Sequence, residues 1–202
     1  MKQLKPIGLC RVAPRLAILL AVGLTTLSIP AGAEEWYGAA SLGQTTLKES
    51  VCGDLSALGF RPCSEDFTDS GLKLAIGNQF SPNAALEFGY ADLGEAKFTA
   101  GVVTCKGDAS GFGASLVGIL PAANQFSFTG RIGLFRSDSS ISCSAGAASV
   151  SDSETSINLT FGVGARYDIT KTVGVRGEWE RFDLGDYGDV DMLLLGIMVK
   201  FK

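Results

Sequence analysis

Seven charged residues recur at alternate positions of short polar–apolar segments. They are Lys73, Glu87, Arg131, Arg166, Arg176, Glu178 and Glu180. Residues two apart in a strand share a face, so Glu178 and Glu180 form a carboxylate pair that could exchange protons. Four cations against three anions also suit a network of ion pairs, and a buried charge without a partner costs several kcal/mol. We interpret the seven residues as one buried ion-pair network.

The residues needed for common catalytic sites are missing. The sequence has no histidine, whose pKa lies closest to neutral pH. The last four of the five cysteines are separated by 10, 41 and 37 residues, unlike the C-x2-C pairs of zinc sites. Gly111-Phe112-Gly113 lies inside an alternating segment and lacks the strand–turn–helix context of a phosphate loop. We therefore predict no enzyme activity, no metal site and no cofactor.

The first 33 residues have the pattern of a secretory signal peptide. Lys2, Lys5, Arg11 and Arg15 precede an apolar stretch, 16–24, and the small residues Ala31-Gly32-Ala33 follow. The apolar stretch is much shorter than the roughly 20 residues of a membrane-spanning helix. We expect cleavage after residue 33 and a single domain over 34–202.

The charge of the expected mature chain argues against nucleic acid as a partner. Four of the 17 basic residues lie before residue 34, which leaves 13 basic residues against 21 acidic ones and a net charge of about −8. Contacts to phosphate require clusters of Lys and Arg.

Segments of about ten residues alternate between apolar residues and small or charged ones. Residues 157–167, for example, read Ile-Asn-Leu-Thr-Phe-Gly-Val-Gly-Ala-Arg-Tyr. Six such segments, together with 36–47 and 190–201, make eight candidate strands. Their connections also alternate: tight turns at 81–83, 121–124 and 168–171 are interspersed with mostly longer connections at 48–70, 95–108, 137–154 and 185–189. This pattern is typical of a transmembrane barrel with short periplasmic turns and long external loops.

The polar face separates a membrane barrel from a soluble one. Its many glycines would serve no purpose in water, whereas eight strands enclose a lumen just wide enough for side chains. Trp36, Tyr167 and Trp179 occupy the apolar face near strand ends, where an aromatic girdle would lie. We predict an all-β fold, an eight-stranded antiparallel up-and-down transmembrane β-barrel. Met192, Leu194 and Met198 fall on the inward face without an explanation from the pattern.

The four cysteines of the mature chain predict disulfides in the external loops. Cys52, Cys63, Cys105 and Cys143 form an even set in an exported chain, and four cysteines allow three pairings. Cys52 and Cys63 share the first long connection. Cys105 and Cys143 lie at similar distances from the turn at 121–124. We expect the pairs Cys52–Cys63 and Cys105–Cys143.

Several segments resemble the small OmpA-like and OmpX-like outer-membrane barrels. These are 36–43 (WYGAASLG), 86–94 (LEFGYADLG), 162–167 (GVGARY) and 176–182 (RGEWERF). The resemblance implies a bacterial outer-membrane location, contact with membrane lipid and lipopolysaccharide, and insertion by the barrel assembly machinery. It also implies a closing strand that ends on an aromatic residue, whereas here Phe201 is followed by Lys202.

Two main function classes follow. The first is a structural or surface-interaction barrel, with a lumen plugged by charge and loops that bind a host or envelope protein in adhesion or envelope integrity. The second is a narrow porin-like channel for small solutes, although general porins need sixteen or more strands. A soluble periplasmic ligand-binding barrel is a third class, but its cavity would need an apolar lining.

Overall fold

The computed structural model describes residues 35–48, 63–146, 148–184 and 188–201, with the side chains of 63–65 excluded. This part of the chain forms nine strands: β1 (Glu35–Leu47), β2 (Cys63–Asp66), β3 (Thr68–Ser81), β4 (Ala84–Ala100), β5 (Val103–Pro121), β6 (Phe126–Ala145), β7 (Ala148–Asp168), β8 (Val173–Asp183) and β9 (Asp189–Phe201). No helix in these residues is long and apolar enough to cross a membrane.

Eight of these strands close into a ring. Each is antiparallel to its neighbours, and β1 joins β9 with Trp36 opposite Phe201 and Leu47 opposite Val190. The short strand β2 lies outside the ring and pairs with the outer end of β4. The predicted eight-stranded antiparallel barrel is therefore confirmed, and β2 is an additional strand that the alternation did not indicate.

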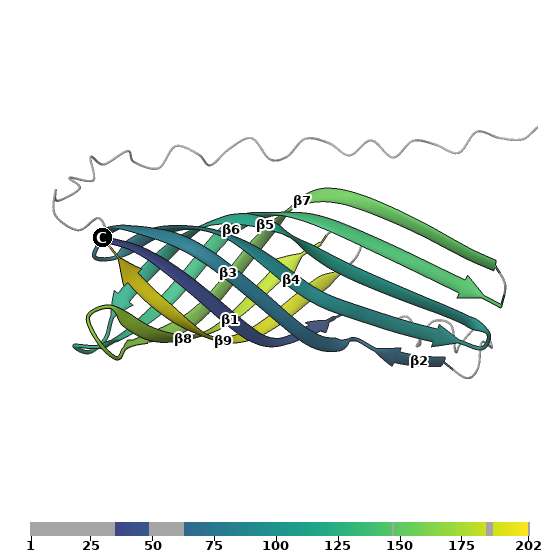
Figure 1. Cartoon of the computed structure of the whole chain (residues 1–202), viewed down its shortest axis with the longest axis horizontal. Coiled ribbons are helices and arrows are strands. Elements are labelled where there is room, and N and C mark those ends of the chain that lie inside the picture. The colour runs from purple at the N-terminus through teal and green to yellow at the C-terminus, as the bar shows by residue number, and fades with distance from the viewer. Residues whose placement is uncertain (1–34, 49–62, 147, 185–187, 202) are drawn as a thin grey trace, which may run out of the picture.

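The tight turns lie at one end of the barrel and the longer connections at the other (Figure 1). The chain reverses within residues 82–83, 122–125 and 169–172, as the turn residues predict. Transmembrane barrels carry short turns on the periplasmic side. We call the opposite end external.

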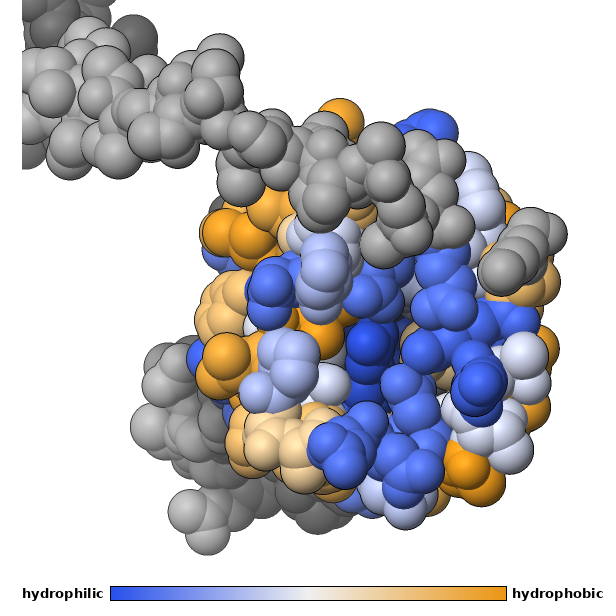
Figure 2. All heavy atoms as spheres, turned by 90° about the vertical axis from the view of Figure 1, so that its left-hand side faces the viewer, coloured by the Kyte–Doolittle hydropathy of each residue, from blue (hydrophilic) through white to orange (hydrophobic). Residues whose placement is uncertain are grey.

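The barrel is apolar outside and polar inside. Leu195, Phe112 and Leu42 expose 71%, 67% and 66% of their surface, whereas Lys73, Glu87 and other charged side chains are buried. Seen from the periplasmic end, hydrophilic residues occupy the middle and hydrophobic residues the rim (Figure 2). An apolar band of this extent around the outside is what a lipid bilayer stabilises.

Strands β4 to β7 continue far beyond the external ends of β1, β8 and β9 (Figure 1). Segments 95–108 and 137–154, which we predicted to be loops, are instead the outer halves of two β-hairpins, apart from the turns at their tips. The prediction was wrong because it identified strands by an apolar face. Strands with water on both faces need none.

A β-bulge marks the point where β4 leaves the barrel. The register of β4 against β5 shifts between Asp92 and Glu95. Gly94 has a φ of 76° there, a conformation that favours glycine. The Asp69 carboxylate accepts hydrogen bonds from the backbone N–H of Glu95 and of Ser70, both at 2.7 Å. Bulges commonly re-aim a strand at the rim of a barrel.

Candidate functional site: the barrel interior and the external sheet

Six of the seven predicted charged residues meet inside the barrel. We call Lys73, Glu87, Arg131, Arg176, Glu178 and Glu180 the inner network. All six are buried, and they come from four strands because each strand directs every second side chain inward. Three cations and three anions give the inner network no net charge.

The two arginines link the carboxylates of the inner network. Arg131 contacts Glu87 at 2.9 Å and also pairs with Glu178. Arg176 contacts Glu87 and Glu178, each at 2.8 Å. Each guanidinium thus donates to more than one carboxylate, an arrangement that its planar, forked geometry favours.

The remaining members are held by neutral groups as well as by charge. Lys73 pairs with Glu180. The hydroxyl of Thr160 donates to Glu180 at 3.0 Å, and the hydroxyl of Tyr37 donates to Glu87 at 2.8 Å. Tyr37 was not among the interior residues predicted from the sequence. The available signal was a phenol on the inward face, because a buried Tyr hydroxyl requires a hydrogen-bond partner.

Arg166 does not join the inner network. Its guanidinium donates to the side-chain oxygen of Gln79 at 3.2 Å, near the periplasmic turn of β3 and β4. Arg166 is the cross-strand partner of Arg176, and like charges opposite one another in a sheet repel. The predicted seven-member network is therefore corrected to six members.

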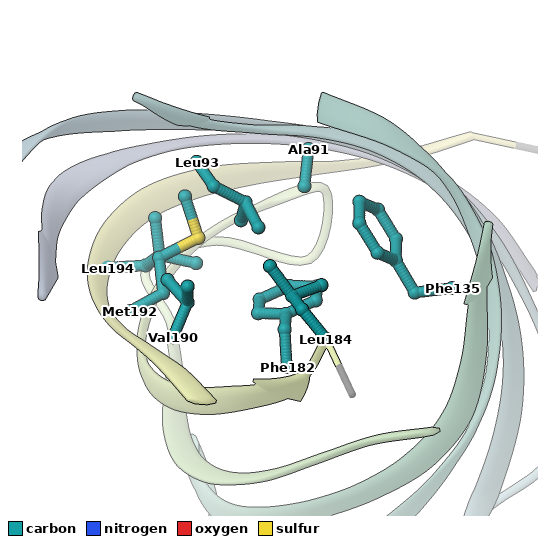
Figure 3. Packing of buried hydrophobic residues seen from close by; sticks show 8 residues of the cluster. All are labelled: Ala91, Leu93, Phe135, Phe182, Leu184, Val190, Met192 and Leu194. Atoms are coloured by element: carbon teal, nitrogen blue, oxygen red, sulfur yellow. The ribbon is translucent and has the colours of Figure 1, made fainter. Parts of the chain in front are cut away.

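An apolar layer lies on the external side of the inner network. Its residues come from β4, β6, β8 and β9 and from the position just after β8, and they point into the ring (Figure 3): Ala91, Leu93, Phe135, Phe182, Leu184, Val190, Met192 and Leu194. The rings of Phe135 and Phe182 pack edge to face with centroids 4.8 Å apart. We call this cluster the external apolar layer.

A second apolar layer lies on the periplasmic side. It consists of Tyr37, Ala39, Ala85, Val117, Ile119 and Met198. The inward methionines and Leu194 that the sequence pattern left unexplained thus belong to the two layers. Flexible Met side chains fill irregular gaps of this kind.

The inner network leaves little free volume. A cavity of about 20 Å³ adjoins Lys73 and Glu180, and another of about 10 Å³ adjoins Arg166 and Arg176. About 10–15 Å³ is needed for one water molecule. Each cavity therefore has room for about one.

The external sheet consists of 95–108, 137–146 and 148–156, with β2 at its edge. Cys105 and Cys143 are direct cross-strand partners on β5 and β6 and form a disulfide. Both lie within strands, not in loops, because the hairpins are longer than expected. The predicted Cys52–Cys63 pair involves Cys52 and the Cys63 side chain, both outside the described part of the structure, and stays a prediction.

Within the described residues, the edge of the external sheet formed by 148–153 of β7 pairs with no further strand, and we call it the free edge. Residues 148–159 of β7 pair with β6 on one side, but pairing with β8 begins only at Thr160. No other strand in the described residues pairs with this stretch. At the opposite edge, β2 covers residues 97–100 of β4.

The three predicted girdle aromatics lie on the outer face. Trp36 and Tyr167 are near the periplasmic end and each exposes 44% of its surface. Trp179 is on β8 nearer the external end, where it contacts the Phe161 ring edge to face and the Arg181 guanidinium at 5.4 Å. Arg181 binds Asp191 of β9 at 2.6 Å, so the apolar surface gives way to charge just beyond Trp179.

The chain matches the family model of the outer membrane protein beta-barrel domain over residues 17–201. It therefore belongs to this family of outer-membrane β-barrels, and its location is the bacterial outer membrane. No curated protein sequence matches the chain.

Solved structures of other small outer-membrane barrels have the same fold. Ail, the attachment invasion locus protein of Yersinia pestis, was crystallised with the heparin analogue sucrose octasulfate. It is 17% identical, with 84% of this chain and 100% of Ail covered and a TM-score of 0.56. Neisserial surface protein A is 16% identical, with coverages of 82% and 97% and a TM-score of 0.56. OprG of Pseudomonas aeruginosa is 11% identical, with coverages of 84% and 96% and a TM-score of 0.51.

Proposed function

We propose that this protein is a surface-interaction barrel. A plugged stem in the outer membrane holds a rigid β-sheet outside the cell, and that sheet binds a protein of a host or of the cell envelope. The observation that carries the proposal is the extension of β4 to β7 beyond the external ends of β1, β8 and β9 (Figure 1), together with the free edge along β7. The proposed role is one of binding, in adhesion or envelope integrity, and not of catalysis.

The contents of the stem favour an anchor over a channel. The inner network lies between two apolar layers, and the cavities beside it each have room for about one water molecule. An ion crossing this stem would have to displace both packed layers. A narrow porin-like channel, the alternative function, would need a continuous polar path through them.

The free edge of β7 suits an extended polypeptide. An unpaired strand presents a row of N–H and C=O groups that another strand can pair with. Residues 148–155 are all exposed, and their sequence is rich in serine. The Cys105–Cys143 disulfide restrains the neighbouring strands, so that a partner would meet a preformed sheet at a low cost in entropy.

The charge of the external sheet argues against a sulfated polysaccharide as the partner. The sheet carries Glu95, Asp108, Asp138, Asp152 and Glu154 against Lys97 and Lys106. Binding a polyanion requires an excess of cations. The sulfated ligand of Ail is therefore not carried over to this chain, and a protein partner is the better match.

A pair of triple-lysine variants tests the role of the edge. Ser149, Ser151 and Ser153 of β7 are the cross-strand partners of Ser144, Ser142 and Ser140 of β6. Lysines on an edge strand block further pairing. Changing the three β7 serines to Lys should therefore abolish adhesion, whereas the same changes on β6 add equal charge away from the edge.

The assay measures adhesion of cells that display each variant to surfaces coated with extracellular matrix proteins or with heparin. Wild type and the β6 variant should adhere to a protein coating, and the β7 variant should not. Equal adhesion by all three, or adhesion to heparin alone, would contradict the proposal. Unheated protein that migrates faster on a gel than boiled protein shows that each barrel is folded.

We propose the same route to the membrane as the sequence indicates. Residues 1–33 act as a signal peptide that is removed during export, and the barrel assembly machinery then inserts the chain among lipid and lipopolysaccharide. The mass of the protein purified from outer membranes tests this, because cleavage after Ala33 predicts an N-terminus at Glu34.

A further inference from the structure

A separate pocket lies at the external mouth of the barrel, between the barrel rim and the external sheet. It has a volume of about 140 Å³ and shares Leu93, Leu184 and Val190 with the external apolar layer, which forms its floor. Leu47, at the end of β1, also lines the pocket and packs against the external apolar layer. The pocket is independent of the free edge of β7.

One wall of the pocket is built from successive inward-facing pairs on β5 and β6. Ala109 is opposite Ser139, and Gly107 is opposite Ile141. The next inward pair is the Cys105–Cys143 disulfide. The covalent link therefore fixes the spacing of the two strands that form this wall.

Gly107 keeps the pocket open. A Cβ atom built at Gly107 would meet only the Ile141 side chain and the Ser140 carbonyl oxygen, each at 3.7 Å. These are ordinary van der Waals distances, so a larger residue would fit the backbone but would occupy the pocket. The small residues Gly107 and Ala109 thus leave the pocket volume unfilled.

Ser139 carries an unused hydrogen-bonding group in this wall. The residue exposes only 7% of its surface, and its hydroxyl has no hydrogen-bond partner. A buried polar group left unpaired costs free energy. Thr45, another polar residue of the pocket, already donates to the backbone oxygen of Asp69 at 3.1 Å.

We propose that this pocket binds a small neutral molecule with one aromatic ring or a short aliphatic chain and a hydroxyl group that pairs with Ser139. The pocket volume suits a single ring, because an apolar cavity of about 150 Å³ binds benzene. An anionic ligand is disfavoured because Glu95 and Asp108 also lie around the pocket. Phenol has the required size and chemistry.

Binding can be measured by NMR on protein in lipid nanodiscs with ¹³C-labelled isoleucine methyl groups. Phenol and benzene should each shift the Ile141 methyl signal. Ser139→Ala should weaken phenol binding about two- to tenfold, the effect of losing one neutral hydrogen bond, and leave benzene binding unchanged. Ser41→Ala is the matched control, since its hydroxyl is also buried and unpaired but lies outside the pocket.

Gly107→Leu should abolish the binding of both probes. Gly118→Leu is its control, because a Cβ atom at Gly118 has as much room but the position is exposed and lies outside the pocket. The proposal is overturned if neither probe shifts Ile141 in the wild type, if both glycine variants bind alike, or if Ser139→Ala weakens benzene as much as phenol.

Discussion

The stem and the external sheet are built from the same strands but are stabilised differently. In the stem, β4 to β7 face lipid on one side and a filled lumen on the other, where Arg131 is enclosed by carboxylates. In the external sheet the charged pairs are open to water, as in the exposed contact of Lys106 with Glu95 at 2.9 Å. Exposed pairs of this kind contribute about 0–1 kcal/mol. The stability of the external sheet therefore depends on the backbone hydrogen bonds between its strands and on the Cys105–Cys143 disulfide.

This difference shows how a single strand can cross the bilayer and then continue into water. Inside the bilayer, the alternation of apolar and small or charged residues is obligatory. Beyond the bulge at Gly94, both faces can be polar, and no packed interior is needed. Mutations in the stem should accordingly affect the whole barrel, whereas mutations in the sheet should act locally.

The largest effect is expected in the inner network. Arg131→Ala leaves Glu87 and Glu178 without one of their cations, and removing one partner of a buried ion pair costs about 3–5 kcal/mol. Arg166→Ala removes the same side chain from the same inward face, but outside the network, and should cost clearly less. Denaturant unfolding of the two variants in detergent measures the difference; equal losses would contradict the six-member network.

The second effect is confined to the external sheet. Replacing both Cys105 and Cys143 by Ser should reduce the stability of the outer β5–β6 ladder by about 2–4 kcal/mol, with the stem unaffected. Hydrogen exchange should rise in 103–107 and 141–145 alone. Thr104→Ala with Ser144→Ala, the neighbouring cross-strand pair, serves as the control. A loss of stem protection in the cysteine variant would show that the two regions are not independent.

A smaller effect is expected at the bulge that joins the two regions. Gly94→Ala should destabilise the protein by roughly 1–2 kcal/mol because alanine disfavours the positive φ. The new Cβ would also lie only 2.8 Å from the Ser70 carbonyl oxygen. Gly101 has a φ of 60°, and a Cβ atom built there would have nothing within 4 Å. Gly101→Ala should therefore destabilise the protein through the backbone conformation alone. Thermal unfolding should rank Gly94→Ala as the less stable variant; the reverse order would argue against a constrained bulge.

The smallest effect concerns pH. The backbone N–H groups of Glu95 and Ser70 donate to Asp69 and hold the pKa of its carboxyl below the ordinary value. The stabilisation is therefore complete at neutral pH and is lost only as the pH falls below about 4 through the lowered pKa. The amide signal of Glu95 should titrate in that acidic range in wild type and not in Asp69→Asn. A midpoint at or above the ordinary pKa would contradict these contacts.

The stem could be predicted from the sequence because lipid imposes the alternation. The first strand was expected at 36–47 and lies at Glu35–Leu47, and the last was expected at 190–201 and lies at Asp189–Phe201. The same alternation assigned the charged residues to one face. It could not reveal that Arg166 binds Gln79 instead of a carboxylate, since that depends on where side chains meet across the lumen.

The external sheet and the apolar layers could not be predicted from the sequence, for a different reason. Segments 95–108 and 137–154 lack an apolar face, so their sequence pattern predicts loops. Phe135 and Phe182 carry no local sign that they meet inside the barrel, because their contact joins β6 to β8. Tyr37 likewise reaches Glu87 fifty residues away. Such contacts form when the strands close into a ring, and the pattern of a single strand does not show which residues will then meet.

The central claim is that a plugged stem anchors the external sheet, and conductance across a planar lipid bilayer tests it most directly. The purified wild-type protein should pass no steady current, because the external apolar layer, the inner network and the periplasmic layer fill the lumen in succession. Large, steady single-channel currents through the wild type would contradict the account and favour a narrow channel.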